Sequence, residues 1–363
     1  MNDFSLIEET VKNIEPLKEE WFTKSKARLD QLTKPLGSLG RLEDVAIRIC
    51  AILQKEKFQF KHKVIFTLAA DHGVTQEGVS AYQSEVTPQM VLNFLRGGAG
   101  INVLSRHEGA RVVVVDMGVN YPFTPQEGLK IRNIRKGSSN FATGPAMTRQ
   151  EAILSVEIGI KLVEEELEKG LDLVGTGEMG IGNTTAASAI TSVMTGKSAE
   201  QVTGLGTGIA LEALQNKVNT IQKALAVNTP NPNDAIDVLA KVGGFEIGGL
   251  AGVILGAASH KIPVVIDGFI SSSAALIANG LSSNARQYMI AGHRSAEPGH
   301  DAILHYLGLS PLLDLRMRLG EGTGACLAMH IVEAACKIYM EMATFGEAQV
   351  SEKVDMTPVK NEI

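Results

Sequence analysis

The chain is poor in cysteine and in aromatic residues, and it lacks a long hydrophobic run. Its three cysteines, Cys50, Cys326 and Cys336, are odd in number and form no C-x-x-C pair, which is typical of buried thiols in a reducing cytosol. The longest apolar run, 250–258, is too short to cross a bilayer. Acids and lysines occupy residues 1–20, where a signal peptide needs an apolar core. These absences predict a cytoplasmic protein that does not enter a membrane.

Basic runs and arginine–aromatic stripes are also absent, and the formal net charge is −6. Both features argue against nucleic-acid binding and leave small-molecule chemistry as the expectation. The 363 residues include 37 glycines and are 44% hydrophobic. Such a composition favours helices that pack closely on a parallel sheet, because small residues let backbones approach each other.

Apolar, strand-like runs alternate with helical patterns along the chain. Each run ends in polar or glycine-rich residues; the runs cover 64–68, 112–115, 171–174, 263–266, 288–291 and 312–319. Helical patterns cover 4–32, 41–55, 88–95, 184–194, 209–226, 233–242, 247–260 and 323–342, and another follows the capping box 148–151 and ends at Gly170. The alternation predicts an α/β fold with an open, mainly parallel sheet flanked by helices. Ligands bind beyond the carboxyl ends of such strands, so the polar segments are expected to form one composite site.

The segment 175–185, GTGEMGIGNTT, places four glycines around Glu178 directly after an apolar run. Glycines let backbone N–H groups converge on an anion, and a helix that begins near Asn183 adds its positive end. Since a carboxylate does not bind an anion, Glu178 indicates a phosphorylated sugar that needs a negative group near its hydroxyls or reacting centre. The spacing matches neither the dinucleotide fingerprint nor the phosphate-binding loop of NTPases. A glycine-rich turn without a ligand remains the alternative.

A second carboxylate, Glu321, lies between Gly320 and Gly322 at the end of an apolar run. Partial desolvation there raises a carboxyl pKa and makes a better general base near neutral pH. An acid at the start of a helix, favoured by the macrodipole, is the alternative. The residues alone do not decide between Glu178 and Glu321 as the base.

Further segments carry groups suited to a sugar phosphate. Asp267 and Gly268 form a strand-end pair that grips ribose hydroxyls or only makes a turn. The loop 204–208 precedes a helix with Lys217, which completes a phosphate site or is a solvated lysine. The mixed segment 80–90 suits the edge of a flat aromatic ligand, although an ordinary loop-to-helix junction has the same composition.

The histidines near these segments do not have metal-ligand spacing. Asp71, His72, His293 and His300 lack a tight motif such as H-E-x-x-H. Histidines that donate hydrogen bonds to the backbone or to Asp71 are expected instead, and no metal is predicted. A G-x-S-x-G elbow for serine hydrolysis is likewise absent from the sequence.

Taken together, six motifs closely resemble the nicotinate-nucleotide:dimethylbenzimidazole phosphoribosyltransferase family. They occur in order along nearly the whole chain: TKPLGSLGRLE from Thr33, AADHGV from Ala69, GEMGIGNTT from Gly177, GGFEIGGLAG from Gly243, SAEPGH from Ser295 and LGEGTGA from Leu319. The resemblance implies a homodimer without a cofactor. It also implies a Rossmann-like catalytic domain, here 33–324, and a small helical domain built from both chain ends, here 1–32 plus 325–363.

The resemblance implies a reaction and roles for residues. Nicotinate mononucleotide and 5,6-dimethylbenzimidazole, or a related flat aromatic base, would give α-ribazole 5′-phosphate and nicotinate with inversion at the ribosyl carbon. Glu321 would be the general base, and Glu178 would lie near the ribosyl centre. The implied phosphoribosyl contacts are Gly180, Ile181, Gly182, Asn183, Lys217, Asp267, Gly268 and Ser295, and Ser84, Gln89 and Leu319 would frame the benzimidazole.

Two other classes of function stay open from the sequence. A sugar-phosphate isomerase on a similar sheet would use His72 or His293 as its base and ignore nicotinate mononucleotide. A nucleotide-binding or regulatory protein without catalysis would be stabilised by its ligand but release no nicotinate. We expect only weak discrimination between flat aromatic bases, because one methyl group in an apolar pocket contributes only about 1 to 3 kcal/mol to the binding free energy.

Overall fold

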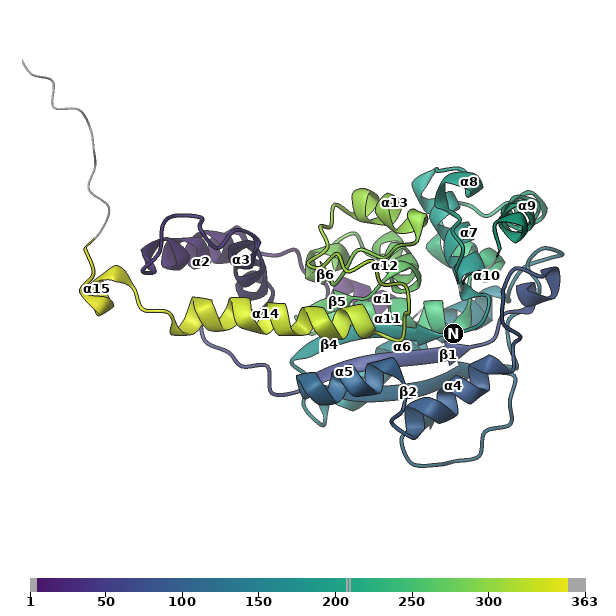
Figure 1. Ribbon diagram of the computed structural model, residues 1–363, viewed down its shortest axis with the longest axis horizontal. Helices are drawn as coiled ribbons and strands as arrows, with labels where there is room; N and C mark the ends of the chain where they lie inside the picture. Colours follow the sequence, from purple (N-terminus) through teal and green to yellow (C-terminus); the bar gives the residue numbers. More distant parts are fainter. Residues whose placement is uncertain (1–4, 207, 209, 352–363) are drawn as a thin grey trace, which may run out of the picture. The chain divides into compact units, whose positions relative to one another are not determined.

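The computed structural model describes residues 5–206, 208 and 210–351, and it contains a six-stranded sheet with helices packed against it (Figure 1). The strand order is β3-β2-β1-β4-β5-β6, and every neighbouring pair is parallel. The strands are β1 (Lys63–Ala70), β2 (Arg111–Gly118), β3 (Leu129–Ile131), β4 (Leu173–Met179), β5 (Val264–Ile266) and β6 (Met289–Ala291). The α/β fold with a parallel sheet is therefore confirmed, and its strand order is that of the Rossmann fold.

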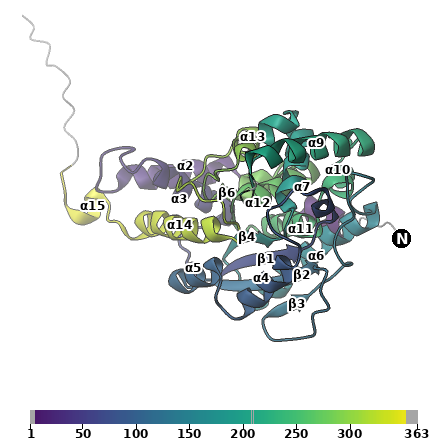
Figure 2. The same cartoon turned by 45° about the vertical axis from the view of Figure 1, so that its right-hand side comes forward.

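The central strands are buried because helices cover both faces of the sheet. Along β1, Leu68 packs against Gly249 of α11 (Phe245–Ser259), whereas Ile65 faces Gly175 of β4 and the start of α14 (Thr323–Glu341). Side chains three residues apart on a strand point to opposite faces, so α11 and the start of α14 cover opposite faces. Figure 2, turned by 45°, shows the sheet between these helical layers.

Two helices on one face approach each other through glycines. A Cβ atom on Gly159 of α6 (Arg149–Leu167) would lie 1.9 Å from the Gly249 carbonyl oxygen, and one on Gly252 would lie 1.9 Å from the Val156 carbonyl oxygen. The two backbones are therefore in direct contact, which only glycine permits at these positions. The predicted close helix packing is confirmed here.

Most predicted helices are present, with shifted ends. The expected helix 4–32 is interrupted before Pro16 and forms α1 (Ser5–Lys12) and α2 (Glu19–Gln31), while α3 covers Arg41–Leu53. Residue 4 and the expected helix start at 209 lie outside the described residues. The other helices expected from the sequence are α4 (Val86–Leu95), α6, α7 (Asn183–Thr195), α9 (Leu211–Asn228), α10 (Ala235–Val242), α11 and α14. The box at Thr148 caps α6, because its hydroxyl accepts from the Glu151 N–H.

Other elements differ from the sequence prediction. The run 312–319 is not a strand, and only Leu313 forms a bridge, to His293, so that prediction was wrong. The edge strand β3 was not predicted. Neither were the helices α5 (Gly100–Glu108), α8 (Ala199–Val202), α12 (Phe269–Leu281), α13 (Pro298–Leu307) and α15 (Phe345–Ala348), nor the 3-10 turns 73–77 and 285–288.

Within the described residues the chain divides into two compact units, 5–16 with 59–331 and 17–58 with 332–351. The second unit contains α2, α3 and α15, and inside it the Arg28 Nε donates to the Tyr339 carbonyl at 2.8 Å. The expected small domain, 1–32 plus 325–363, overlaps this unit in part and stays a prediction, as does 33–324 for the catalytic domain. Residues 352–363 of that expectation lie outside the described residues.

Candidate active site

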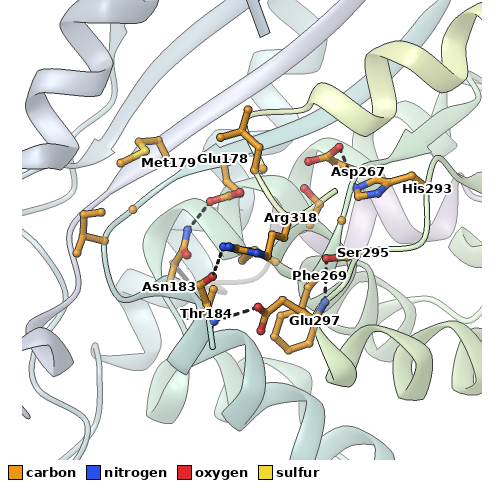
Figure 3. A pocket seen from close by; sticks show the side chains of 18 residues that line it. Glu178, Met179, Asn183, Thr184, Asp267, Phe269, His293, Ser295, Glu297 and Arg318 are labelled. Carbon is orange, nitrogen blue, oxygen red and sulfur yellow. Dashed lines mark hydrogen bonds and ion pairs between the residues drawn. The ribbon is translucent and has the colours of Figure 1, made fainter. Parts of the chain in front are cut away.

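A pocket opens at the carboxyl edge of the sheet, where β4, β5 and β6 end (Figure 3). The cradle after β4 lies next to the end of β1, the point at which the strand order reverses and where open α/β sheets bind ligands. The lining comprises 178–181, Asn183, Thr184, Gly206, 267–271, His293, Ser295, Glu297 and 318–320. The predicted convergence of strand-end segments is therefore present in the structure.

The glycine-rich turn after β4 leads directly into α7. Gly182 has φ +92°, a left-handed backbone that glycine adopts easily, and α7 begins at the next residue. The Ile181 N–H donates to the Thr87 hydroxyl at 3.1 Å, so this amide is already bonded within the protein. Asn183 and Thr184, at the positive end of α7, line the pocket. This end of the helix therefore suits an anion.

Glu178 is buried at the end of β4, and its carboxylate accepts a hydrogen bond from Asn183 Nδ2. Burial raises the pKa of Glu178 to about 8. The hydrogen bond from Asn183 lowers this pKa, whereas the negative charges of Asp267, Glu246 and Glu321 raise it further. A pKa of about 8 favours the protonated side chain at neutral pH.

Glu321 has a backbone conformation that non-glycine residues rarely adopt. Its φ is +65°, between Gly320 at +84° and Gly322 at +97°. Its Oε2 accepts from the Ile101 N–H at 3.0 Å, at the start of α5, and its carbonyl accepts from the Thr67 hydroxyl at 3.0 Å. Burial raises the pKa of the Glu321 carboxyl, and the amides of α5 oppose that shift.

The two glutamates are neighbours, although the pocket lining includes Glu178 and Gly320 but not Glu321. A Cβ on Gly320 would lie 2.2 Å from Glu178 Oε1, so the backbone just before Glu321 is packed against that carboxyl group. The charge of Glu321 also contributes to the raised pKa of Glu178.

Asp267 follows β5, and both of its carboxylate oxygens accept backbone hydrogen bonds. Oδ1 accepts from Gly324 at 2.7 Å and from Ala325 at 2.9 Å, and Oδ2 accepts from Gly322 at 3.3 Å. His293 Nε2 lies 3.7 Å from Oδ1. Burial raises the pKa of Asp267, and His293 and the three amides oppose the shift.

Lys217 is fully buried behind the pocket and does not line it. Its Nζ donates to the Thr184 hydroxyl at 2.8 Å, and Thr184 does line the pocket. Burial lowers the pKa of Lys217 to about 8, and the charge of Glu297 opposes the shift. The cation therefore acts on the pocket through Thr184.

Two charged residues of the lining were not predicted. Arg318 is exposed, and its Nη1 donates to the Gly206 carbonyl at 3.1 Å (Figure 3). Glu297 is buried, and its Oε1 accepts from the Gly206 N–H at 2.9 Å. Both belong to motifs quoted from the sequence or border them, since Glu297 is part of SAEPGH and Arg318 precedes LGEGTGA directly.

The predicted site residues divide into two groups. The pocket lining brings together Glu178, Gly180, Ile181, Asn183, Asp267, Gly268, Ser295 and Leu319. The lining does not include Gly182, Lys217, Glu321, Ser84 or Gln89. Ser84 lies with its Oγ 3.2 Å from the Thr75 Oγ1, and Gln89 is on α4.

The histidines near the site differ in environment. His72 is buried beside Gly180 and Gly182, and its Nε2 lies 2.7 Å from Glu246 Oε1. Burial opposes its charged form, but Glu246 outweighs that effect and raises the pKa of His72. His300 accepts from the Ser295 N–H at its Nδ1, so its Nε2 donates to Ser272; burial lowers the pKa of His300 to about 3. His293 is the histidine that lines the pocket.

Among residues 5–206, 208 and 210–351, no group of three or more His, Cys, Asp or Glu side chains could hold a metal ion. The site combines three acidic side chains with the positive ends of two helices. The acids are Glu178, Asp267 and nearby Glu321, and the helices are α7 and α12. Such a site can stabilise a cationic centre beside the acids and an anionic group at the helix ends. It can also accept a proton at a desolvated carboxylate.

Comparisons with known proteins agree over nearly the entire chain. A family model described as phosphoribosyltransferase matches residues 14–350. A nicotinate-nucleotide–dimethylbenzimidazole phosphoribosyltransferase of Chloroflexus aurantiacus is 56% identical over 349 residues, which is 96% of this chain and 99% of that protein. The protein of the same name from Geobacter sp. (strain M21) is 55% identical over 346 residues, 95% of this chain and 99% of that protein.

A solved structure has the same fold. The crystal structure of CobT from Thermus thermophilus superposes with a TM-score of 0.89 at 44% identity, and the match covers 92% of this chain and 100% of that one. In the part of the chain that is described, none of the helices is long and apolar enough to cross a membrane.

Proposed function

Because this chain belongs to the family of nicotinate-nucleotide–dimethylbenzimidazole phosphoribosyltransferases, we propose that it transfers the phosphoribosyl group of nicotinate mononucleotide to 5,6-dimethylbenzimidazole. The products are α-ribazole 5′-phosphate and nicotinate. The chain is an enzyme of the pentosyltransferase class, and its family acts in cobalamin synthesis.

The observation that carries this proposal is the position of Glu321. Its desolvated carboxylate is held by the amide of Ile101 and lies beside Glu178, which lines the pocket. A phosphoribosyl transfer to an imidazole needs a proton acceptor next to a site that favours positive charge. Both requirements are met by neighbouring groups at this edge of the sheet.

Glu321 acts as the general base in this mechanism. The bond between the ribosyl carbon and the pyridinium nitrogen breaks, and its electron pair returns to nicotinate. A bond forms from the same carbon to one imidazole nitrogen of the base. The proton on the other imidazole nitrogen passes to the Glu321 carboxylate. Nicotinate leaves from a nitrogen that is already cationic, so its departure needs no general acid.

Glu178 stabilises the sugar as the bond to nicotinate breaks. The ribosyl carbon gains oxocarbenium character, and an adjacent carboxylate opposes that positive charge. Burial raises the pKa of the Glu178 carboxyl group to about 8, and a cationic pyridinium substrate beside it favours the ionised form. Attack opposite the leaving nicotinate converts the β-linkage to α, with inversion and without a covalent intermediate.

Apart from Asp267, the remaining predicted residues bind the two substrates. The cradle Gly180–Asn183, with Lys217 acting through Thr184, holds the phosphate, which the positive end of α7 favours. Gly268 and Ser295 also line the pocket, and we place the ribosyl group against them. Ser84, Gln89 and Leu319 frame the flat base. Leu319 lines the pocket and is 60% exposed, so it offers apolar surface at the mouth.

The test is product analysis of the purified protein. We expect incubation with nicotinate mononucleotide and 5,6-dimethylbenzimidazole to release nicotinate and to form an α-linked ribotide. A panel of benzimidazole, adenine and a phenol ranks the acceptable bases. Ribose 5-phosphate is included because an isomerase would convert it and leave nicotinate mononucleotide intact. Ligand-induced stabilisation without nicotinate release would assign a binding protein instead.

The family resemblance also supports a homodimer in the cytoplasm. Three buried free cysteines, Cys50, Cys326 and Cys336, are consistent with a reducing compartment. Size-exclusion chromatography with light scattering measures the oligomeric state directly, and a monomer at micromolar concentration would contradict the dimer.

A further inference from the structure

The carboxylate of Asp267 is hydrogen-bonded to the backbone of the loop that carries Glu321. Its two oxygens accept from the N–H groups of Gly322, Gly324 and Ala325 at 2.7 to 3.3 Å. Two of these amides belong to the first turn of α14, which has no intrahelical acceptor for them. The third follows Glu321 directly in the chain. Asp267 therefore fixes the backbone on the C-terminal side of the proposed base.

These hydrogen bonds matter because the backbone of Glu321 has a left-handed conformation that is unfavourable for a residue with a side chain. Three consecutive left-handed residues, 320–322, include one with a side chain, and such a strained conformation persists only where the neighbouring structure holds it. Thr67 holds the carbonyl of Glu321 and Ile101 holds its carboxylate. Asp267 is itself fixed, because its N–H donates to the Thr176 hydroxyl at 3.1 Å.

We propose that Asp267 is a positioning residue for the reaction, which acts by holding the strained loop so that the Glu321 carboxylate reaches the incoming base. This inference rests on the proposed function, since it needs Glu321 as the base. It assigns Asp267 a role different from gripping ribose hydroxyls, because three backbone amides take three of the about four acceptor sites on its oxygens. Glu321, by contrast, is the catalytic residue.

The charge of Asp267 gives the proposal a second signature. Glu321 faces Asp267 at the end of β5, Glu178 at the end of β4 and the amides of α5; Glu178 in turn faces Glu246 of α11. His293, after β6, is the charge partner of Asp267, and His72 is the partner of Glu246. The negative charge of Asp267 raises the pKa of both Glu178 and Glu321, so its removal lowers both.

The test is the variant Asp267→Asn, assayed for kcat, for KM of both substrates and for the pH dependence of kcat. The amide keeps one acceptor oxygen but points N–H groups at a backbone N–H, so the loop is released in part. We expect kcat to fall about 10- to 100-fold while KM for nicotinate mononucleotide stays within about twofold. The acid limb of the profile moves to lower pH.

A matched control is Asp234→Asn, because Asp234 also caps a helix, α10, by accepting from Ile236 and Asp237, and it does not line the pocket. Its kinetics should be unchanged. Thr176→Val removes the hydroxyl that accepts from the Asp267 N–H and leaves the carboxylates of Asp267 and Glu321 in place, so kcat should fall. Thr176→Ser keeps a hydroxyl and should retain the kcat of the unsubstituted protein. This pair tests the proposal independently if Asp267→Asn does not fold.

The outcomes separate this inference from the proposed function. A large rise in KM for nicotinate mononucleotide at normal kcat would make Asp267 a substrate contact and overturn the positioning role. Normal kcat in both Asp267→Asn and Thr176→Val would overturn it as well. If Glu321→Gln also keeps full turnover, the failure lies in the proposed base; if Glu321→Gln is inactive, only the role of Asp267 has failed.

Discussion

At the scale of a single residue, Glu321 joins a strained backbone to a desolvated carboxylate. Its left-handed φ of +65° directs the side chain to the start of α5, where the Ile101 N–H donates to Oε2. That hydrogen bond favours the ionised form, whereas burial favours the neutral form. The raised pKa makes the carboxylate more basic than an exposed glutamate, which suits a group proposed to accept a proton.

The first prediction concerns Glu321→Gln, which keeps the shape of the side chain and removes its basicity. We expect kcat to fall at least about a hundredfold, because proton removal contributes about 10²- to 10⁴-fold in such reactions. Binding of nicotinate mononucleotide, measured by calorimetry, should persist. Glu164→Gln on α6 is a matched surface control, since Glu164 is exposed. Turnover close to that of the control would remove Glu321 from the role of base.

Sequence patterns located strand-end residues at the carboxyl edge of the sheet better than they indicated the contacts that each residue makes. Glu178 and Glu321 could be singled out because each stands in a glycine-rich strand end, and parallel strands bring such ends together. The burial of Lys217 behind Thr184 could not be foreseen, because it depends on how α9 packs beside α7. Asp267 could be found, but the occupancy of both its oxygens depends on a loop far away in the sequence.

At the scale of an element, the loop 319–322 is shaped by its contact with Glu178. Gly320 has φ +84°, and a Cβ added there would lie 2.2 Å from Glu178 Oε1. Any side chain at this position therefore strains the backbone and also displaces a carboxyl group in the pocket. The two effects can be separated experimentally.

Gly320→Ala is predicted to lower the free energy of unfolding by about 1 to 2 kcal/mol and kcat by more than about tenfold. Gly308→Ala provides the matched comparison, because Gly308 has φ +65° with no atom within 4 Å of an added Cβ. That control should lose similar stability but retain kcat. Urea unfolding and steady-state kinetics measure the two quantities. Equal kinetics in the two variants would mean that the contact with Glu178 is irrelevant to turnover.

The elements that the sequence predicted correctly are the long, strongly patterned ones. Strands β1, β2 and β4 and helix α6 with its capping box were legible because their signals extend over many residues. The run 312–319 looked like a strand, but its backbone hydrogen bonds to residues 291–296 are scattered and form only one bridge, at Leu313. The three-residue strand β3 and the small-residue helix α12 carry too little periodicity to identify, since both are specified by their tertiary neighbours.

At the scale of the whole molecule, the buried acid Glu178 couples stability to pH. Its pKa rises from 4.5 to about 8 on folding, so between these values the folded state holds a proton that the unfolded chain has lost. The folded state then binds more protons, and stability falls as pH rises through this window. The loss is complete above about pH 8 and amounts to a few kcal/mol.

The prediction is that Glu178→Gln removes this contribution. Relative to the unsubstituted protein, the variant should gain stability progressively between pH 5 and about pH 8 and show no further gain above that. Urea unfolding at several pH values measures the difference, and subtraction cancels the groups that both proteins share. A difference that stays constant across the range would show that Glu178 titrates near its ordinary value in the folded protein.

The parallel sheet could be predicted from the alternation of strand-like and helical segments along a chain of this length. Strands that alternate with helices leave a parallel sheet as the simplest solution, and the site then has to lie at the carboxyl edge. Division of the chain into units was harder, because no linker rich in glycine, serine or proline marks the turning points near residues 17, 59 and 332. Such boundaries are set by contacts between distant segments, which sequence patterns do not encode.

The glycine contact between α6 and α11 changes how mutational data on this enzyme should be interpreted. Alanine scanning assumes that each replacement subtracts atoms, so a loss of activity reports what the missing atoms contributed. At Gly159 and Gly252 the same replacement inserts a methyl group 1.9 Å from a carbonyl oxygen. A scan would therefore flag these two positions, which lie outside the pocket lining, as strongly as the proposed catalytic acids, and only the kind of defect, misfolding rather than slow turnover, would separate them.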